Sequence, residues 1–204
     1  KTNGKFTFIR KDVRFSLLTD RLLRVEVDKN LHFTDEPTQT VICRNFAEPV
    51  FKTVEDGDSI IIITTKAIFN YDLSQHKMTG ISLKGGKSLT EYQSGNLRGT
   101  YRTLDQANGA VKLGDGVMSR DGVAVVDDTV SLILNSDGTI GERKKTQKDE
   151  YYFAYNHDYR ACLSDFFKLC GKVPLVPRYC LGNWWSRYKA YTQEEYLSLM
   201  NEFI

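Results

Sequence analysis

Hydrophobic and polar residues alternate along much of the first part of the chain. Residues 6–10 and 22–27 place apolar side chains at about every second position, as a strand with one buried face does. Residues 59–65 form an unbroken, mostly β-branched run that suits the middle of a sheet. Turn residues such as Asp56-Gly57-Asp58 separate these segments, and no helical period interrupts them. The pattern predicts an antiparallel β-sandwich.

Further strands are expected as far as residue 155, with one region left open. The shorter or less regular candidates are residues 13–18, 41–43, 50–51, 67–71, 122–128, 130–134 and 151–155. Residues 73–121 are dense in glycine and polar residues. They are either a long, partly ordered loop or hairpins that the pattern does not place. The charge run at residues 142–150 is expected to be an exposed loop.

A helical period first appears after residue 156. One face of this segment carries Tyr159, Cys162, Leu163, Phe166, Phe167 and Cys170. Asn156 or Asp158 can cap its start, and Gly171 can end it. The sequence therefore predicts a helix over residues 156–169.

Two prolines, Pro174 and Pro177, make the next segment extended. Residues 179–185 then form a short apolar run without alternation, which fits a strand buried on both faces of a parallel sheet. Thr192 and Glu195 have the spacing of a capping box, so a helix is expected to follow. One strand and one helix cannot make a parallel sheet. We therefore expect a chain cut from a longer protein, divided into a domain at 1–172 and a second element at 173–204.

The composition argues against several classes of partner. Lys and Arg total 28 against 26 for Asp and Glu, so neither nucleic acid nor an anionic membrane is expected. No run approaches the ~18 apolar residues of a membrane span. Cys43, Cys162, Cys170 and Cys180 lack metal-ligand spacing and are expected to be buried free thiols in a reducing compartment. We expect a cytoplasmic protein without a metal or an organic cofactor.

One stretch resembles a known family. Residues 174–188 read Pro-Leu-Val-Pro-Arg-Tyr-Cys-Leu-Gly-Asn-Trp-Trp-Ser-Arg-Tyr, and Tyr191-Thr192 and a Glu-rich helix start follow. They resemble the entry to the catalytic barrel in glycoside hydrolase family 31, the α-glucosidases and α-xylosidases. Further similar segments are residues 18–26, 33–39, 96–105, 118–122, 149–153 and 157–160. The resemblance implies a mainly β fold: a galactose-mutarotase-like N-terminal β-sandwich, a helix, and a truncated first strand–helix unit of a (β/α)8 barrel.

The resemblance also implies where sugar would bind. In the family, a loop of the N-terminal sandwich reaches over the barrel mouth, and an aspartate on it binds the non-reducing sugar. Asp115 matches this position best and Asp105 second; the alternative for Asp115 is a turn aspartate between two glycines. Trp184, Trp185 and Arg187 are candidates to face the sugar from the end of a barrel strand. Alternatively, the tryptophans fill the core and Arg187 pairs with a barrel carboxylate.

No acidic residue matches the family's two catalytic aspartates, which a retaining glycosidase places about 5–5.5 Å apart. Asp127 and Asp128 are neighbours at a strand end, so their side chains point to opposite faces and cannot flank one bond. We therefore expect an inactive N-terminal fragment of a retaining α-glycosidase that acts on terminal α-linked glucose or xylose of oligosaccharides.

The alternatives are a free-standing carbohydrate-binding module, a structural sandwich without sugar contact, and a lyase or transglycosidase parent. A barrel strand at residues 179–185 without neighbours would have unpaired backbone groups. We expect residues 178–204 to be disordered, to fold back on the sandwich, or to pair with the same segment of a second molecule, and we favour this self-association.

Overall fold

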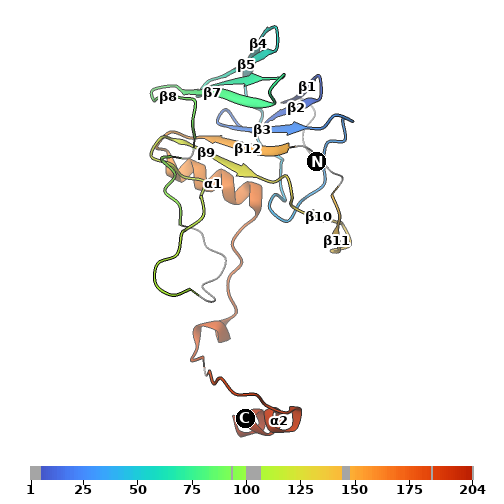
Figure 1. Ribbon diagram of the computed structural model, residues 1–204, viewed down its shortest axis with the longest axis vertical. Helices are drawn as coiled ribbons and strands as arrows, with labels where there is room; N and C mark the ends of the chain where they lie inside the picture. The colour runs from blue at the N-terminus through green and yellow to red at the C-terminus, as the bar shows by residue number, and fades with distance from the viewer. Residues whose placement is uncertain (1–5, 93, 100–106, 144–147, 185, 204) are drawn as a thin grey trace. The chain divides into compact units, whose positions relative to one another are not determined.

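The computed structural model describes residues 6–92, 94–99, 107–143, 148–184 and 186–203. The chain divides into two units, Lys1–Lys172 and Val173–Ile204. The described part of the first unit is built from antiparallel sheets and one helix, α1 (Tyr159–Cys170) (Figure 1). The mainly β fold that the sequence predicts is therefore confirmed.

Two five-stranded sheets make up most of the first unit, and neighbouring strands in both run antiparallel. The first sheet has the order β1 (Thr7–Arg10), β2 (Val13–Leu17), β3 (Leu22–Val27), β12 (Lys148–Ala154) and β9 (Val123–Asp127). The second has the order β4 (Phe51–Asp56), β5 (Ser59–Thr64), β6 (Ala67–Asp72), β7 (Lys77–Leu83) and β8 (Ser88–Leu89). A small hairpin pairs β10 (Ile133–Leu134) with β11 (Ile140–Gly141).

Apolar side chains fill the space between the two sheets. Along β5 and β6 every second residue is buried, which places Ile62 and Phe69 in this core. Phe15 of β2 meets Tyr71 of β6 edge to face, with ring centroids 5.1 Å apart, a favourable geometry for an aromatic pair. Successive side chains of a strand point to opposite faces of its sheet, so the buried half of β5 and of β6 faces the other sheet.

A second core lies on the other face of the first sheet, against α1 (Figure 1). Because β3 is covered on both sides, all six of its residues are buried. Asp158 caps α1 by accepting a hydrogen bond from the Ala161 amide at 3.2 Å, and Gly171 ends the helix with a φ of 96°. Leu169, near the end of the helix, is fully buried in this core.

Charged residues are also buried on this second face of the first sheet. The Arg24 guanidinium donates Nε to Asp149 Oδ1 at 2.8 Å and Nη2 to Asp149 Oδ2 at 2.7 Å. Its neighbour Arg14 makes a similar pair with Glu26, at 2.6 and 3.0 Å. The side chains of Arg24, Glu26 and Asp149 are 0% exposed. Two hydrogen bonds join each guanidinium to its carboxylate, and this geometry suits a pair removed from water.

This ion network also fixes two segments that have little secondary structure of their own. The Thr34 carbonyl accepts hydrogen bonds from both Arg14 and Arg24, which holds the chain after β3 against the sheet. Arg143 lies between Asp128 and Asp149 and contacts both carboxylates. Asp128, which is fully buried, also accepts hydrogen bonds from Thr38 at 3.0 and 2.9 Å. Its role is structural, as the strand-end interpretation expected.

Two expectations for the first unit are wrong, and a region left open is resolved. The charge run is not wholly an exposed loop, because its last three residues belong to β12 and Asp149 is buried by pairing with two arginines. Residues 41–43 form no strand. The amides of Ile42 and Cys43 instead donate to the Leu169 carbonyl at the end of α1, a position where helix carbonyls lack intrahelical partners. The open region, residues 73–121, contains β7 and the short β8.

The second unit contains two short helices, η2 (Arg178–Leu181) and α2 (Gln193–Glu202). The strand predicted at residues 179–185 is wrong for the described residues 179–184, which contain a 3-10 turn. Its amides bond locally, Cys180 to Pro177 and Gly182 to Tyr179, as backbone groups do when no neighbouring strand is available. The capping box is confirmed, since Thr192 and Glu195 each accept the other's backbone amide. Self-association stays a prediction, which light scattering would check.

Replacing Asp149 by asparagine should destabilise the first unit strongly. The change leaves Arg24 and Arg143 buried without their shared counter-charge, so we expect the free energy of unfolding to fall by about 3–5 kcal/mol. Urea unfolding followed by circular dichroism measures it. Asp56→Asn, at the exposed end of β4, is the matched control and should change stability by less than about 0.5 kcal/mol. A loss below about 1 kcal/mol for Asp149→Asn would contradict the prediction.

The same carboxylate should make stability depend on pH. Burial works to raise the pKa of Asp149, but the charges and hydrogen bonds of Arg24 and Arg143 outweigh burial and hold this pKa below its usual range. Because the folded pKa lies below the unfolded value of about 3.9, the stabilisation is complete above that value. It is lost as the pH falls through the folded pKa. Below about pH 4, unmodified protein should therefore lose more stability than the Asp149→Asn variant.

Candidate functional site

Between β8 and β9, Arg98, Gly99 and residues 115–118 lie beside β9 and α1, and an asparagine joins these two segments. Asn96 donates its side-chain Nδ2 to the Gly116 carbonyl at 2.8 Å. Its Oδ1 accepts from the amides of Gly116 at 3.0 Å and Arg98 at 2.8 Å. The Leu97 amide also donates to the Met118 carbonyl at 3.0 Å. These bonds hold the segment that follows Asp115 against residues 96–98.

Asp115 lies beside Gly116 in this loop and faces Arg98. The Arg98 Nε and the Asp115 Oδ1 are 3.6 Å apart, and both side chains are partly exposed. Arg98 has a φ of 56°, an uncommon value for a residue with a side chain, and Gly99 follows with a φ of 126°. Left-handed backbone of this kind is found at turns and at binding sites, where surrounding contacts hold it.

A cavity of about 490 Å³ opens next to this pair. Its apolar walls come from the chain before β9, from β9 itself and from α1, and include Val117, Met118, Val125, Leu163 and Phe166. Its polar groups are Thr40, Arg98, Asp115 and Asp127. The Asp127 carboxylate already accepts from the Thr129 amide at 2.9 Å. The volume falls within the roughly 300–1,000 Å³ of typical small-molecule sites, which combine apolar walls with a few polar groups.

This arrangement can hold a ligand that presents several hydroxyl groups. A carboxylate accepts hydrogen bonds from hydroxyls and a guanidinium donates them, while the apolar wall can cover the carbon face of a ring. Among the described residues, no cluster of three or more histidine, cysteine, aspartate or glutamate side chains is arranged to hold a metal ion. The cavity is thus a candidate binding site whose chemistry rests on Asp115 and Arg98.

The structure describes three of the five residues that the sequence singled out. Asp115 lines the cavity of the first unit. Trp184 and Arg187 lie in the second unit, where both are exposed, and Trp184 donates its indole Nε1 to the Cys180 carbonyl at 3.0 Å. Asp105 and Trp185 lie outside the described residues. Sugar contact by these five residues stays a prediction.

Sequence reasoning missed Arg98, Asn96 and Phe166 as parts of the site. Phe166 was placed on the apolar face of the helix, and that face also forms a wall of the cavity. The pairing of Asn96 with Gly116 joins residues twenty positions apart, and no periodicity reports such a contact. A signal for the turn was present in the Arg98-Gly99 pair, since glycine tolerates left-handed backbone.

No family model matches the chain. An alpha-xylosidase of Saccharolobus solfataricus is 27% identical over 143 residues, which are 65% of this chain and 18% of that protein. The crystal structure of a family 31 alpha-xylosidase from a soil metagenome, complexed with xylose, aligns with a TM-score of 0.51 and 13% identity. That alignment covers 97% of this chain and 38% of the other. The chain is thus similar in sequence to an alpha-xylosidase and in fold to a family 31 alpha-xylosidase.

A family 31 dextranase of Flavobacterium johnsoniae, complexed with glucose, aligns over 83% of this chain and 27% of its own, with 14% identity and a TM-score of 0.46. The likeness to the soil-metagenome enzyme shows a shared fold. The chain spans less than a fifth of the Saccharolobus enzyme and under two fifths of the soil-metagenome enzyme. No helix in the described residues is long and apolar enough to cross a membrane.

The thiol of Cys162 lies beneath the loop that carries Asp115, so its exposure to solvent depends on the position of this loop. Its Sγ lies 3.2 Å from the Val117 carbonyl, and the residue is 2% exposed. Burial, and to a lesser extent the nearby charges of Asp165 and Asp158, raise the pKa of this thiol to about 12. At pH 8 the thiol is therefore almost entirely protonated and unreactive while the loop stays closed.

Loosening the loop should expose this thiol. Asn96→Ala removes two hydrogen bonds between the two segments of the loop and one within the first segment, each worth about 0.5–1.5 kcal/mol, so we expect alkylation of Cys162 at pH 8 to accelerate by about tenfold or more. Peptide mapping by mass spectrometry follows Cys162 separately from the other cysteines. Asn135→Ala, which removes a hydrogen bond to Thr139 in another hairpin, is the control and should leave the rate unchanged. Equal alkylation rates for both variants would show that the hydrogen bonds of Asn96 do not hold the loop closed over Cys162.

Proposed function

We propose that this chain is the N-terminal, non-catalytic part of a retaining α-glycosidase that removes terminal α-linked glucose or xylose from oligosaccharides. Within that enzyme, the cavity at Asp115 forms part of the sugar pocket. The similarity to family 31 supports the reaction class. The observation that carries the site is the placement of Asp115 and Arg98 at the opening of an apolar cavity of sufficient size for a sugar.

The position of Asp115 supports sugar contact. Asp115 lines the cavity together with Arg98, whose Nε lies 3.6 Å from the Asp115 Oδ1. Asn96 holds Gly116, the residue next to Asp115, by two hydrogen bonds. A carboxylate at the opening of an apolar cavity can accept hydrogen bonds from ligand hydroxyls.

A second candidate function is a carbohydrate-binding module. The cavity favours it, because every residue that lines it belongs to the first unit. A binding module would retain xylose or glucose on the isolated chain, whereas a pocket wall would bind them only when the rest of the enzyme is present. Titration of both sugars into the isolated chain separates the two functions.

The cytoplasm is the proposed location. All four cysteines are free, and Cys162 and Cys170 are shielded enough for burial to raise the pKa of both thiols to about 12. Free thiols are typical of reducing compartments.

Asp115→Asn should impair the full-length enzyme. The substitution keeps the shape of the side chain but removes its charge, and a lost charge-assisted hydrogen bond is worth about 1.5–3 kcal/mol. We therefore expect kcat/KM on aryl α-glucosides or α-xylosides to fall by about tenfold or more. Steady-state kinetics on both substrate series measures this and shows which sugar is preferred.

Asp137→Asn, in an exposed turn away from the cavity, is the matched control and should leave kcat/KM unchanged. Asp105→Asn tests the second candidate position in the same assay. If neither Asp115→Asn nor Asp105→Asn alters the kinetics, the loop does not contribute to sugar binding.

The isolated chain should not hydrolyse aryl α-glucosides or α-xylosides. The family resemblance matches none of its acidic residues to the catalytic aspartates, and retaining hydrolysis needs two carboxyl groups about 5–5.5 Å apart. Release of the aryl group, followed by absorbance, should stay at the rate of the buffer blank. Turnover that copurifies with the chain and is lost on substitution of one of its own carboxylates would show that the active site has been misplaced.

A further inference from the structure

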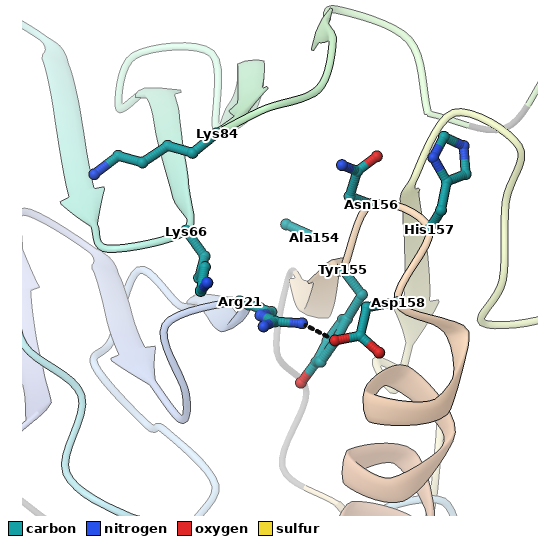
Figure 2. Close-up of a pocket in the computed structure, with 8 residues that line it drawn as sticks. All are labelled: Arg21, Lys66, Lys84, Ala154, Tyr155, Asn156, His157 and Asp158. Carbon is teal, nitrogen blue, oxygen red and sulfur yellow. Dashed lines mark hydrogen bonds and ion pairs between the residues drawn. The ribbon is translucent and has the colours of Figure 1, made fainter.

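A second, basic cavity lies where the ends of the two sheets meet the start of α1 (Figure 2). Its volume is about 240 Å³. Arg21 comes from the turn before β3, Lys66 from the turn between β5 and β6, and Lys84 from the end of β7. The opposite wall is the chain between β12 and α1, residues 154–158. The cavity therefore gathers positive charges from three separate turns.

The acidic group in this cavity is already engaged. Asp158 accepts a hydrogen bond from Arg21 Nη1 through Oδ2 at 2.7 Å, the pair drawn in Figure 2, and Oδ1 accepts from the Ala161 amide as the helix cap. The hydrogen bond from Arg21, followed by the one from the Ala161 amide, lowers the pKa of Asp158, so the group stays ionised at neutral pH. Arg21 also lies 3.8 Å from Asp20, so both nearby carboxylates serve the same arginine.

The two lysines make no close ion pair within the described part of the chain, although the charge of Lys66 acts on Asp158 at longer range. Among the residues that the structure describes, no carboxylate forms an ion pair with Lys66 or Lys84. The two residues are held together by their backbones, since the Lys84 amide donates to the Lys66 carbonyl at 2.9 Å. Two like charges fixed on adjacent chain segments repel, and an anion bound between them removes that repulsion. Both ammonium groups sit on flexible stems with three donors each, so they can turn toward such an anion.

Neutral donors line the facing wall. Asn156 has a φ of 54°, an uncommon backbone conformation for a residue with a side chain, and its amide side chain lines the cavity. The Nε2 of His157 lies 2.9 Å from the Arg120 carbonyl, which can only accept, so this nitrogen carries a proton. The cavity thus offers two ammonium groups and a side-chain amide. A volume below the roughly 300–1,000 Å³ of drug-sized sites suits a small group.

We propose that this cavity binds a small oxyanion, a phosphate group, between Lys66, Lys84 and the Asn156 amide. Phosphate presents several acceptor oxygens, which match the donors of the two lysines and the amide. The site is independent of the sugar cavity at Asp115, and its lining residues are different. The group is either free inorganic phosphate or a phosphate carried by a sugar.

Isothermal titration calorimetry of the whole chain with inorganic phosphate tests the proposal. At low salt we expect one saturable site with a Kd of about 1 mM or tighter. Affinity should weaken as ionic strength rises from about 0.01 to 0.15 M, because the Debye length falls from about 30 to 8 Å. The double variant Lys66→Gln/Lys84→Gln should lose at least about tenfold in affinity.

Lys52→Gln/Lys77→Gln is the matched control, because it removes the same charge from the same sheet outside the cavity. It should keep the affinity within about twofold. Absence of saturable binding, or an equal loss in the control pair, overturns the proposal. If the first pair fails to fold, Lys84→Gln alone serves, with an expected loss of about threefold or more; unchanged affinity in that variant also overturns it.

A second arm identifies the source of the phosphate. Glucose 6-phosphate and glucose are titrated under the same conditions. Affinity for the sugar phosphate at least about tenfold above that for inorganic phosphate assigns a sugar-borne group, and equal affinity assigns free phosphate. Binding of glucose with the same affinity as its phosphate shows that the cavity does not recognise the oxyanion, and overturns the proposal.

Discussion

The buried pairing of Arg24 with Asp149 is the constraint on which the first unit depends. The two residues lie on β3 and β12, neighbouring strands that come from opposite ends of this unit, and neither side chain touches solvent. Breaking such a pair costs far more than it contributes when intact, because the remaining charge is stranded in a nonpolar environment. The pair therefore sets a penalty on any other register of β3 against β12. Arg14 with Glu26 extends the same constraint to β2.

This network of buried ion pairs positions the strands and the helix that carry both cavities. β12 leads directly into the chain that caps α1, and β9 pairs with β12 on its other side. α1 then supplies Leu163 and Phe166 to the cavity at Asp115, and Asp158 to the basic one. Neither cavity is built from a single element, so each needs β12, α1 and the neighbouring turns in register. A rigid scaffold carrying its binding groups on loops is the common arrangement of functional sites.

The sequence predicts local features of this fold well and distant pairings poorly. Alternation located β3, an unbroken β-branched run located β5, and the capping residues located α1, because these signals depend only on near neighbours. Asp149 was placed in an exposed loop, since its charged neighbours indicate solvent and its partner Arg24 lies 125 positions away. The apolar run at residues 179–185 predicts a strand, but a strand requires neighbouring strands, and the described chain supplies none at this segment.

The residues of the two cavities are likewise hard to predict from the sequence, because they depend on distant pairings. Asp115 was found through family resemblance, whereas the arginine and asparagine that orient its loop have no motif of their own. Lys66 and Lys84 look like ordinary surface lysines in the sequence, and only the pairing of two turns brings them to one opening. Arg21 forms ion pairs with both nearby carboxylates, Asp20 and Asp158. The positive charge that remains in the cavity therefore belongs to the two lysines. The charge that the cavity offers to an anion therefore depends on which ion pairs form, and these ion pairs exist only in the tertiary structure.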